Sequence, residues 1–527
     1  AGQTYGFAVT YVSGSIRYTN GTGANQIYQD DNMKIECGKG GSYWGFTINP
    51  RVWNGSIFYS KLGGACESDR VPLTVNISGF PTEDAGVTQM VDPGPTMPSG
   101  VNTPVSFEFT NYSYTPMTSV KVHWELDGVY QDSILWTGTL NNGEVDTVSF
   151  PSMSFIGGVH SVKAWTALPN TYNDTININD TLKTSFRSCM NGLFTIGDTA
   201  TGSFDYPSFN AAVYDLENAG ICGSVVFEVD SGTYLEQVTI TEIPGVDMNN
   251  TITFRSATGD STDVVLQYSA TGTADNWTLL LDSADYITFE KMTIQSLGAS
   301  YGRVVEVRNG AMYNTFRNNV IDVVTATTSS NASGFYDYTT LNHYNTYESN
   351  LIYGGYYAMY IYGQNTSSWE KGTIIKNNEI ARFQLYGLFL YYQDSVQATG
   401  NYIHGLTNTY GYGFYTYYCF NKFNFSKNTV VLNPTNYAYA FRVYYCNYYL
   451  YKGSSGPGLV SNNMISITSG TGTNYGMYAY YSDDVDYLYN TVHCETGGTS
   501  TRSLYQYNTT SNTVGQRFQN NIFGGNS

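Results

Sequence analysis

Charged residues are scarce in this sequence of 527 residues, and basic residues are the scarcest. Lys and Arg number 24 against 42 Asp and Glu, giving a formal net charge of −18. Nucleic-acid binding needs a clustered Lys/Arg footprint, so we expect no nucleic-acid partner. No apolar run reaches the roughly 18 residues of a membrane-spanning helix, so we expect no membrane insertion. Neither an initiator Met nor a signal peptide opens the sequence, which predicts a segment of a longer, processed polypeptide.

Recognisable catalytic constellations are also missing. The five His show neither metal-ligand spacing nor the partners of a nucleophilic triad; they are His123, His160, His343, His404 and His493. A uronide lyase needs a base together with a cation beside the substrate carboxylate. The repeat strands described below offer only Arg442, whose neighbours predict a guanidinium stacked among aromatic rings.

Paired carboxylates, which a glycoside hydrolase requires, are equally hard to find. The acidic cluster of the repeat region is Asp483, Asp484 and Asp486, in a turn where a solvated loop or a structural calcium site is the favoured interpretation. We therefore predict no catalytic residues and no cofactor, with calcium at this loop as the alternative. Asp337 and Glu306 are assigned to inward positions of the repeat, without an explanation.

Aromatic and turn-forming residues are abundant by contrast, with 50 Tyr and 54 Gly. A five-residue pattern recurs with an Asn in phase behind it. The Asn residues are spaced 23 to 35 residues apart: Asn319, Asn350, Asn378, Asn401, Asn428, Asn463, Asn490 and Asn521. One short strand and one turn Asn per period predict a stacked solenoid, with amide side chains bonding coil to coil.

The pattern also predicts which side chains point outward. Its second position is always apolar and therefore inward: Phe335, Met359, Leu388, Phe414, Phe441, Met477 and Leu504. Alternation then places two ladders outward. One is Tyr336, Tyr360, Phe389, Tyr415, Arg442, Tyr478 and Tyr505; the other is Tyr338, Tyr362, Tyr391, Tyr417, Tyr444, Tyr480 and Tyr507. Simple ring packing, a protein–protein interface and a carbohydrate platform are three interpretations of these ladders.

The seven cysteines favour an oxidising, extracellular setting. Cys37 and Cys66 are the two cysteines of the first unit, and Cys189 and Cys222 bracket a predicted amphipathic helix over 208–218. Cys419 and Cys446 each follow the outward Tyr by two residues, so we expect them one above the other in adjacent coils. We predict the disulfides Cys37–Cys66, Cys189–Cys222 and Cys419–Cys446, leaving Cys494 free.

Three units follow from these patterns. Residues 1–81 read as an antiparallel β-sandwich, and a Pro/Gly-rich run from Pro93 to Pro98 lies near the start of the second unit. Residues 82–187 hold about seven short strands and a core Trp, which indicates an immunoglobulin-like sandwich. Residues 188–527 form the solenoid of about ten coils, whose first coil the helix caps. The fold class is all-β.

Two motifs of the solenoid resemble known families. The run from Ser224 to Ile240, SVVFEVDSGTYLEQVTI, resembles the first coil of pectin-methylesterase-like β-helices. The later Gly-Φ-x-Φ and Asn-x-Ile repeats resemble the right-handed parallel β-helix of pectate-lyase-like proteins. Neither the esterase motif GxxDFIFG nor the lyase motif RxPxxR is present, so the resemblance implies the fold without the activity.

The whole assembly resembles large secreted adhesin-like surface proteins of Bacteroidota, exported by the type IX secretion system. Three segments carry this resemblance: AGQTYGF with YTNGT and PRVWNGSIFY, similar to the latter part of a jelly-roll-type domain; DAGV from Asp84, similar to an adhesin module; and YPSFNAAV between Cys189 and Cys222. The lineage implies O-glycans at Asp-Ser/Thr triplets. The predicted sites are Ser133, Thr147, Thr175, Thr181, Thr199, Ser261, Ser283 and Ser395.

These observations favour a non-enzymatic extracellular cell-surface protein, an adhesin or fibre component whose β-helix is a rigid, tyrosine-faced rod. Its expected partners are other surface-protein copies or extracellular glycans. The alternative is a polysaccharide-binding or polysaccharide-degrading β-helix protein. A cleft with convergent carboxylates or bases would favour the enzyme, and an uninterrupted aromatic face would favour adhesion or assembly.

Overall fold

The computed structural model describes residues 82–198, 202–338, 342–365, 367–448, 455–496, 498, 500–508 and 515–526, with six short strands between residues 18 and 53. Those six strands form three antiparallel pairs. They are β1 (Tyr18–Asn20) with β6 (Arg51–Trp53), β2 (Ile27–Gln29) with β3 (Lys34–Glu36), and β4 (Gly40–Ser42) with β5 (Gly45–Ile48). Most of the predicted first sandwich lies outside the described residues.

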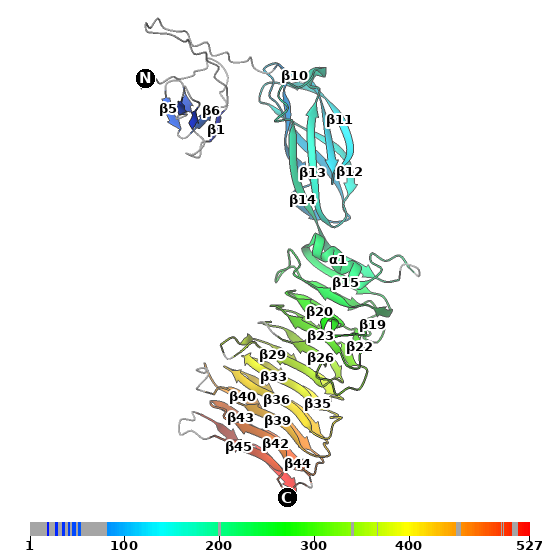
Figure 1. Ribbon diagram of the computed structural model, residues 1–527, viewed down its shortest axis with the longest axis vertical. Coiled ribbons are helices and arrows are strands. Elements are labelled where there is room, and N and C mark those ends of the chain that lie inside the picture. Colours follow the sequence, from blue (N-terminus) through cyan, green and yellow to red (C-terminus); the bar gives the residue numbers. More distant parts are fainter. Residues whose placement is uncertain are drawn as a thin grey trace.

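A β-sandwich follows, drawn in blue to cyan in Figure 1. One sheet has the order β12 (Val145–Ser154), β9 (Asn102–Asn111), β7 (Ala85–Asp92). The other contains β11 (Val129–Leu140), β10 (Met117–Leu126), β13 (Gly158–Ala167) and β14 (Thr181–Ile196), with β8 (Thr96–Pro98) beside β14; a 3-10 turn, η1, spans Pro169–Thr171. Trp124 packs in the core between Phe107 and Phe150, because alternate residues of these strands are apolar.

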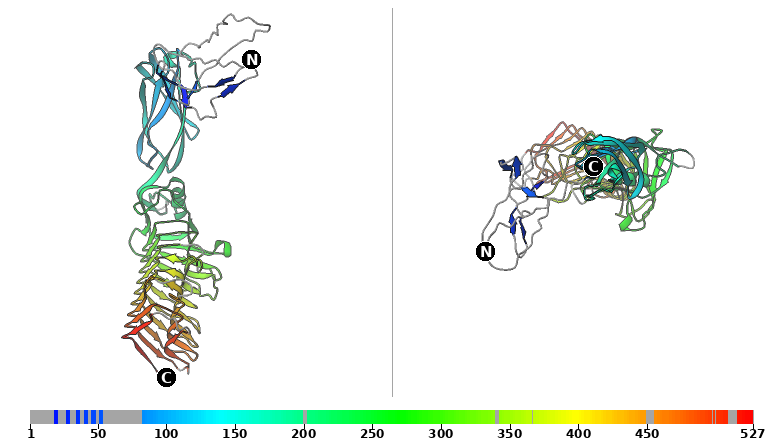
Figure 2. Two further views of the ribbon diagram at one scale, coloured as in Figure 1. Left: turned by 90° about the vertical axis from the view of Figure 1, so that its left-hand side faces the viewer. Right: turned by 90° about the horizontal axis from the view of Figure 1, so that it is seen from above.

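The rest of the chain is a parallel solenoid of about eleven coils, whose strands stack like steps in Figure 2. Each coil contributes a strand to three sheets, and identical positions lie one coil apart. The first sheet continues from β14 through β15 (Ile221–Val229), β18 (Ile252–Ser256), β21 (Ile287–Glu290), β24 (Thr315–Arg317), β27 (Thr346–Glu348), β31 (Ile374–Lys376), β34 (Gln397–Thr399), β37 (Asn424–Ser426), β40 (Gly458–Ser461), β43 (Val485–Leu488) and β46 (Arg517–Gln519).

The second and third sheets complete each coil. The second comprises β16 (Gly232–Leu235), β19 (Val264–Tyr268), β22 (Thr293–Ser296), β25 (Val320–Val323), β28 (Leu351–Tyr353), β32 (Glu379–Ala381), β35 (Tyr402–His404), β38 (Thr429–Leu432), β41 (Met464–Ile467), β44 (Thr491–Glu495) and β47 (Ile522–Asn526). The third comprises β17 (Val238–Ile240), β20 (Leu279–Asp282), β23 (Gly302–Arg308), β26 (Ala332–Asp337), β29 (Tyr357–Tyr362), β33 (Tyr386–Asp394), β36 (Gly411–Phe420), β39 (Ala438–Tyr444), β42 (Asn474–Tyr480) and β45 (Arg502–Tyr507), with β30 (Glu370–Lys371) beside β33. A 3-10 turn, η2, spans Thr273–Asp275.

The Asn of each coil forms the predicted internal ladder. Asn428 is typical: its amide nitrogen donates to Ala398 O at 2.9 Å and to Asn463 Oδ1 at 3.1 Å, while its own Oδ1 accepts from the backbone N–H of Asn401 at 3.0 Å. The same contacts recur from Asn319 to Asn521. Because these amides are hydrogen-bonded and, except for Asn521, buried, they fix the corner of each coil from Asn319 onward.

The helix α1 (Phe209–Ala219) lies between the sandwich and the coils in Figure 1, at the predicted place. The Ser208 hydroxyl caps it by accepting from the Ala211 N–H at 3.1 Å, as Ser does at helix N-termini. Phe209, Ala212 and Leu216 are fully buried against the first coil. The helix therefore covers the apolar end that the first coil would otherwise expose.

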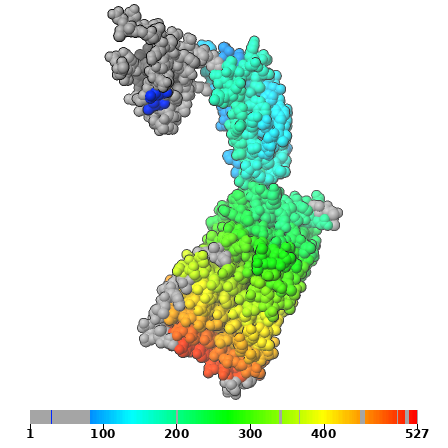
Figure 3. Space-filling model, in the orientation of Figure 1, coloured from blue at the N-terminus to red at the C-terminus, as the bar shows by residue number. Residues whose placement is uncertain are grey.

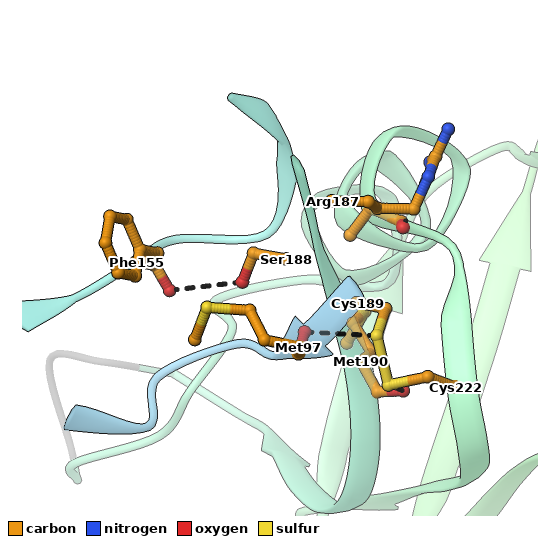
Figure 4. The surroundings of a disulfide bond; sticks show 8 residues. Met97, Phe155, Arg187, Ser188, Cys189, Met190 and Cys222 are labelled. Atoms are coloured by element: carbon orange, nitrogen blue, oxygen red, sulfur yellow. Dashed lines mark hydrogen bonds between the residues drawn. A yellow bond between two sulfur atoms is a disulfide. The ribbon is translucent and has the colours of Figure 1, made fainter. Parts of the chain in front are cut away.

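The sandwich and the solenoid share one strand across the narrow neck visible in Figure 3. β14 pairs antiparallel with β13 of the sandwich and then parallel with β15 of the first coil. The unit boundary predicted at residue 187 lies inside this strand. Figure 4 shows the disulfide Cys189–Cys222 at the joint, with a Cα–Cα distance of 5.6 Å. Arg187 donates to the last carbonyls of α1, at Asn218 and Ala219. The shared strand, the disulfide and this arginine therefore all connect the sandwich to the first coil.

Candidate interaction face

The third sheet presents its predicted ladders to the outside of the solenoid. Successive rings stack face to face, with centroids 4.9 Å apart for Tyr336–Tyr360 and 4.7 Å for Tyr362–Tyr391. Interplanar angles at these two pairs are 8° and 12°. The ring distance follows the coil spacing of roughly 4.8 Å, because the strands are parallel and in register. The inward partners Phe335, Met359 and Leu388 are fully buried.

Two further tyrosine columns flank the predicted ladders. One consists of Tyr357, Tyr386, Tyr412, Tyr439 and Tyr475, with centroids 4.8 to 5.3 Å apart. The other consists of Tyr392, Tyr418, Tyr445 and Tyr481. The second column follows a signal that sequence reasoning missed, the Tyr-Tyr doublets at the end of four repeats. We call all four columns together the tyrosine face.

The doublets carry an unusual backbone. Tyr392, Tyr418, Tyr445 and Tyr481 have φ between 46° and 55°, the left-handed region that aromatic residues rarely adopt. Each therefore turns the chain after an outward Tyr and packs its own ring edge-on against it, as in Tyr391–Tyr392 at 4.2 Å. The face widens by one column as a result.

Stacking decides which part of each ring is available to a partner. The faces are covered by neighbouring rings, so the surface presents ring edges and phenol groups. The end rings Tyr338 and Tyr507 are 37% and 38% exposed, whereas the rings between them are half-buried. A sugar ring lying flat on an aromatic face, the third interpretation of the ladders, would have to displace a stacked neighbour.

Two phenol groups within the face, those of Tyr357 and Tyr415, have a pKa above the ordinary range of tyrosine. Burial, reinforced by neighbouring tyrosines, raises the pKa of Tyr357 to about 12. Burial also raises the pKa of Tyr415 to about 12, although the charge of Arg442 opposes it. The face is therefore uncharged at neutral pH apart from its arginine, and its hydroxyls can donate hydrogen bonds.

Arg442 is the cation inside the tyrosine face, stacked among rings as the sequence predicts. Its guanidinium carbon lies 4.2 Å from the Tyr444 centroid and 4.5 Å from that of Tyr415. Tyr439 and Tyr478 follow at 5.7 and 5.5 Å. Four rings around one guanidinium form a cation–π cage.

Charged residues gather at the N-terminal end of the same sheet. Glu306 is in register with Tyr336 and so belongs to the outward row, which corrects the inward assignment made from the sequence. It is nevertheless only 5% exposed, because Arg303 at 2.7 Å and Arg308 at 3.4 Å cover it. Arg308 also bonds Asp282 at 2.9 Å. Arg303 in turn stacks 3.5 Å from the Tyr336 ring, so these charges continue the tyrosine face and neutralise one another.

The acidic residues predicted as calcium candidates do not converge. Asp483 is 3% exposed and accepts from Asn508, while Asp486 forms an ion pair with Arg517 at 2.7 Å. Asp484 lies between them in a turn with φ 46°. Asp483 and Asp486 therefore bond different neighbours on different elements.

Three other carboxylates do meet, in the sandwich. Among the described residues, Asp84, Asp174 and Asp180 are the group of three acidic, His or Cys side chains whose ligand atoms lie within 4.8 Å of one another. Asn179 and the Ala85 N–H donate to Asp84 and Asp174. Burial, with the charges of Asp174 and Asp84, raises the pKa of Asp180 to about 6.

The histidines take structural roles where the structure gives their contacts. His160 bonds Asp127 at 2.8 Å, His404 bonds Glu379 at 3.0 Å, and His123 stacks on Trp165. His343 Nδ1 accepts from the Lys371 N–H, and His493 lies 4.0 Å from Glu495.

The disulfide predicted between Cys419 and Cys446 is not formed, and both are buried free thiols. They do lie in adjacent coils, since the Asn447 N–H donates to Cys419 O at 2.9 Å. β36 continues through Cys419, whereas β39 ends at Tyr444, so the ladder register no longer places Cys446 directly opposite Cys419. Cys446 is in hydrogen-bonding contact with the Cys419 thiol and also lies 3.5 Å from the Thr416 hydroxyl. Cys494 is also free, and Cys37 and Cys66 lie outside the described residues.

The predicted glycosylation sites differ in access. Thr147, Thr175 and Thr181 are exposed, but the Thr175 hydroxyl donates to Glu83 O at 2.7 Å. The half-buried sites are Ser133, Ser261, Ser283 and Ser395, and Thr199 lies outside the described residues.

A family model described as a right-handed β-helix region matches residues 277–448. The solenoid is a right-handed β-helix. No curated protein matches the chain. Among solved structures, the pectate lyase Pel9A is 13% identical over 58% of this chain and 80% of its own, with a TM-score of 0.39. The family 28 exopolygalacturonase of Yersinia enterocolitica is 8% identical over 83% and 99%, with a TM-score of 0.31.

A third similar structure matches a smaller share of this chain. The CARDB domain of the PF1109 protein of Pyrococcus furiosus is 15% identical over 21% of this chain and 96% of its own, with a TM-score of 0.18. Identities this low carry no ligand or reaction over to the β-helix. No helix among the described residues has the length and apolar character needed to cross a membrane.

Proposed function

We propose that this chain is a non-enzymatic extracellular cell-surface protein, an adhesin or a fibre component, with the β-helix as a rigid rod and the tyrosine face as its interaction surface. One observation carries the proposal. The four columns of the tyrosine face hold aromatic rings and Arg442, and none of their positions is a carboxylate. Hydrolysis of a glycosidic bond needs two carboxyl groups about 5 to 9 Å apart. The four columns hold none, and the neighbouring Glu306 and Asp282 are ion-paired with Arg303 and Arg308.

The rigidity of the molecule supports the same function. The Asn ladder bonds the coils from Asn319 to Asn521 to one another, and β14 with its disulfide joins the rod directly to the sandwich. A scaffold that transmits force or spaces a partner gains from such continuity, whereas an enzyme that closes over its substrate needs mobile elements.

The chemistry of the face indicates the kind of partner. A contiguous aromatic surface on a soluble chain typically marks an interaction site. Its exposed edges and phenol groups suit the hydrogen-bonding surface of another protein copy or of an extracellular glycan. Export by the type IX system and glycosylation of the exposed Thr147 and Thr181 belong to the same proposal.

Electron microscopy and sedimentation of the purified chain, followed by a polysaccharide panel, test this function. We expect either ordered association of copies or glycan binding without product release. Tyr417→Lys, in the middle of the tyrosine face, should abolish the interaction, whereas Tyr214→Lys on the exposed side of α1 should leave it unchanged. Release of shortened or unsaturated sugars, abolished by replacing Glu306, would establish the enzyme instead.

A further inference from the structure

The interior of the β-helix contains a cluster of buried titratable side chains in addition to the Asn ladder. Asp337, Tyr347, Glu370 and Gln393 are each 0% exposed. They come from β26, β27, β30 and β33, and Glu370 is the direct ladder partner of Gln393 in the next coil. Two carboxyl groups buried together are costly if both are ionised, so their protonation states need an explanation.

The hydrogen bonds of Asp337 identify it as the ionised member. Asn342 Nδ2 donates to one carboxylate oxygen at 2.6 Å, and the Tyr347 hydroxyl donates to the other at 2.9 Å. Both oxygens therefore act as acceptors, which is the bonding of a carboxylate rather than of a carboxylic acid.

Glu370 has the opposite bonding. Its Oε1 accepts from the Thr373 hydroxyl at 2.8 Å, while its Oε2 is buried without a hydrogen-bond partner among the described residues. Gln393 Oε1 is likewise buried and unpartnered there. The two side chains are within hydrogen-bonding reach of each other.

The amide of Gln393 cannot resolve this by turning over. Its Nε2 donates to Tyr391 O at 3.2 Å, and a flipped amide would place an oxygen against that carbonyl. Two acceptor oxygens thus lack a donor in the same place, and a single proton on Glu370 satisfies both.

We propose that Glu370 holds a proton at neutral pH and donates it as a hydrogen bond to Gln393 Oε1, so that the β-helix contains a proton-binding site between two coils. Burial, reinforced by the charge of Asp337, raises the pKa of Glu370 well above its ordinary value, although the hydrogen bond from Thr373 opposes it. Burial also raises the pKa of Asp337, to about 7, but hydrogen bonds from Asn342 and Tyr347 to its carboxylate oppose that rise. Burial raises the pKa of Tyr347 as well, which keeps its phenol a donor.

The cation next to Glu370 in the chain, Lys371, is exposed while Glu370 is buried, because successive side chains of β30 point to opposite sides. Cys419 is the next inward side chain beyond Gln393, and burial raises its thiol pKa so that it stays neutral. On the neighbouring strands, Lys371 and Asp394 are ladder partners, and His343 contacts the Lys371 N–H. The proton is therefore the species that neutralises Glu370.

Infrared difference spectroscopy in D₂O at pH 7 tests the site in the full chain. Wild type minus Glu370→Gln should show the carbonyl band of one protonated carboxylic acid. Wild type minus Glu348→Gln, at a half-buried carboxylate on the first sheet, should show a carboxylate band only. A carboxylate band for Glu370 would overturn the proposal. If Glu370→Gln does not fold, the spectrum of Asp337→Asn decides, because an acid band that belongs to Glu370 must remain at pH 7 when the Asp337 carboxyl group is removed.

Thermal melting separates the two carboxyl groups. Glu370→Gln keeps a donor toward Gln393, so its Tm should stay within about 2 °C of wild type, whereas Asp337→Asn places an amide donor against Asn342 or Tyr347 and should lower Tm by roughly 5 °C or more. The reverse order, or equal losses, would contradict the assignment of the proton to Glu370.

Discussion

Two faces of this β-helix use the same stacked backbone in opposite ways. On the tyrosine face, one residue type repeats from coil to coil. On the first sheet, outward positions in register alternate in charge over six coils: Glu228, Arg255, Glu290, Arg317, Glu348 and Lys376. We call this row the charge ladder. Three of its pairs form ion pairs, Glu228–Arg255 at 2.8 Å, Glu290–Arg317, and Glu348–Lys376 at 3.0 Å.

The difference follows from what a parallel in-register stack imposes. Equivalent side chains lie about 4.8 Å apart, so a repeated charge would face its own sign in both directions. A repeated aromatic ring gains a stacking contact on both sides. A neutral surface can therefore repeat and become a broad uniform face, while a charged surface must alternate and neutralises itself. This is why we propose the tyrosine face, and not the charge ladder, as the surface that meets a partner.

Alkaline titration should give the largest effect, because it ionises the phenols of the tyrosine face. Burial raises the pKa of Tyr357 and Tyr415 to about 12, against about 10 in an unfolded chain. The unfolded state thus releases protons first, and stability present below pH 10 is lost as pH rises from about 10 to 12. Tyrosinate absorbance and circular dichroism should change together in this window.

The denatured chain provides the control for this titration. In denaturant, its tyrosinate absorbance should rise with a midpoint near pH 10. Native phenols that also titrate there, with circular dichroism unchanged, would show that the tyrosine face is open to solvent and not stabilised by stacking.

Reversing one sign should break the charge ladder. Arg317→Glu places three carboxylates in a row, Glu290, residue 317 and Glu348, and should cost about 2 kcal/mol in urea unfolding at low salt. Arg317→Gln removes the attraction without adding repulsion and should cost about half as much. Added salt should reduce the gap between the two variants. Equal losses, independent of salt, would mean that alternation of charge is incidental.

Removing one ring should weaken the tyrosine face by a similar but salt-independent amount. Tyr417 stacks at 4.6 Å on Tyr391 and 4.7 Å on Tyr444. Tyr417→Ala loses both contacts and part of its buried area, for roughly 1–2 kcal/mol, whereas Tyr417→Phe keeps the ring and should stay within about 0.5 kcal/mol. Denaturant unfolding measures both, and a larger loss for Phe than for Ala would assign the stability to the hydroxyl instead.

Sequence reasoning recovered the repeating parts of this molecule and missed the parts that depend on pairs of coils. The inward positions, the two central ladders and the Asn ladder follow from periodicity alone, because the repeat imposes them on every coil. The charge ladder was not predicted because each coil contributes a single charged residue to it. The alternation of sign is seen only when Glu290 is aligned with Arg255 and Arg317 in the neighbouring coils. The predicted Cys419–Cys446 disulfide is wrong for a related reason. The repeat places the two residues in adjacent coils, but it does not determine whether their sulfur atoms come within bonding distance.

Replacing Arg442 by Tyr should change the free energy of unfolding least. It tests directly whether a neutral, repeated ring column is more stable than one that holds a charge. Arg442 interrupts a ring column between Tyr415 and Tyr478, and its Nε is buried without a hydrogen-bond partner among the described residues. Arg442→Tyr completes the column, so stability should rise by about 0.5 kcal/mol, the stacking gain exceeding the lost cation–π contacts. Arg442→Leu, which is apolar but cannot stack, should be less stable than either. If Arg442→Tyr is destabilising in denaturant unfolding, the face is organised around its cation, and an anionic partner becomes the one to seek.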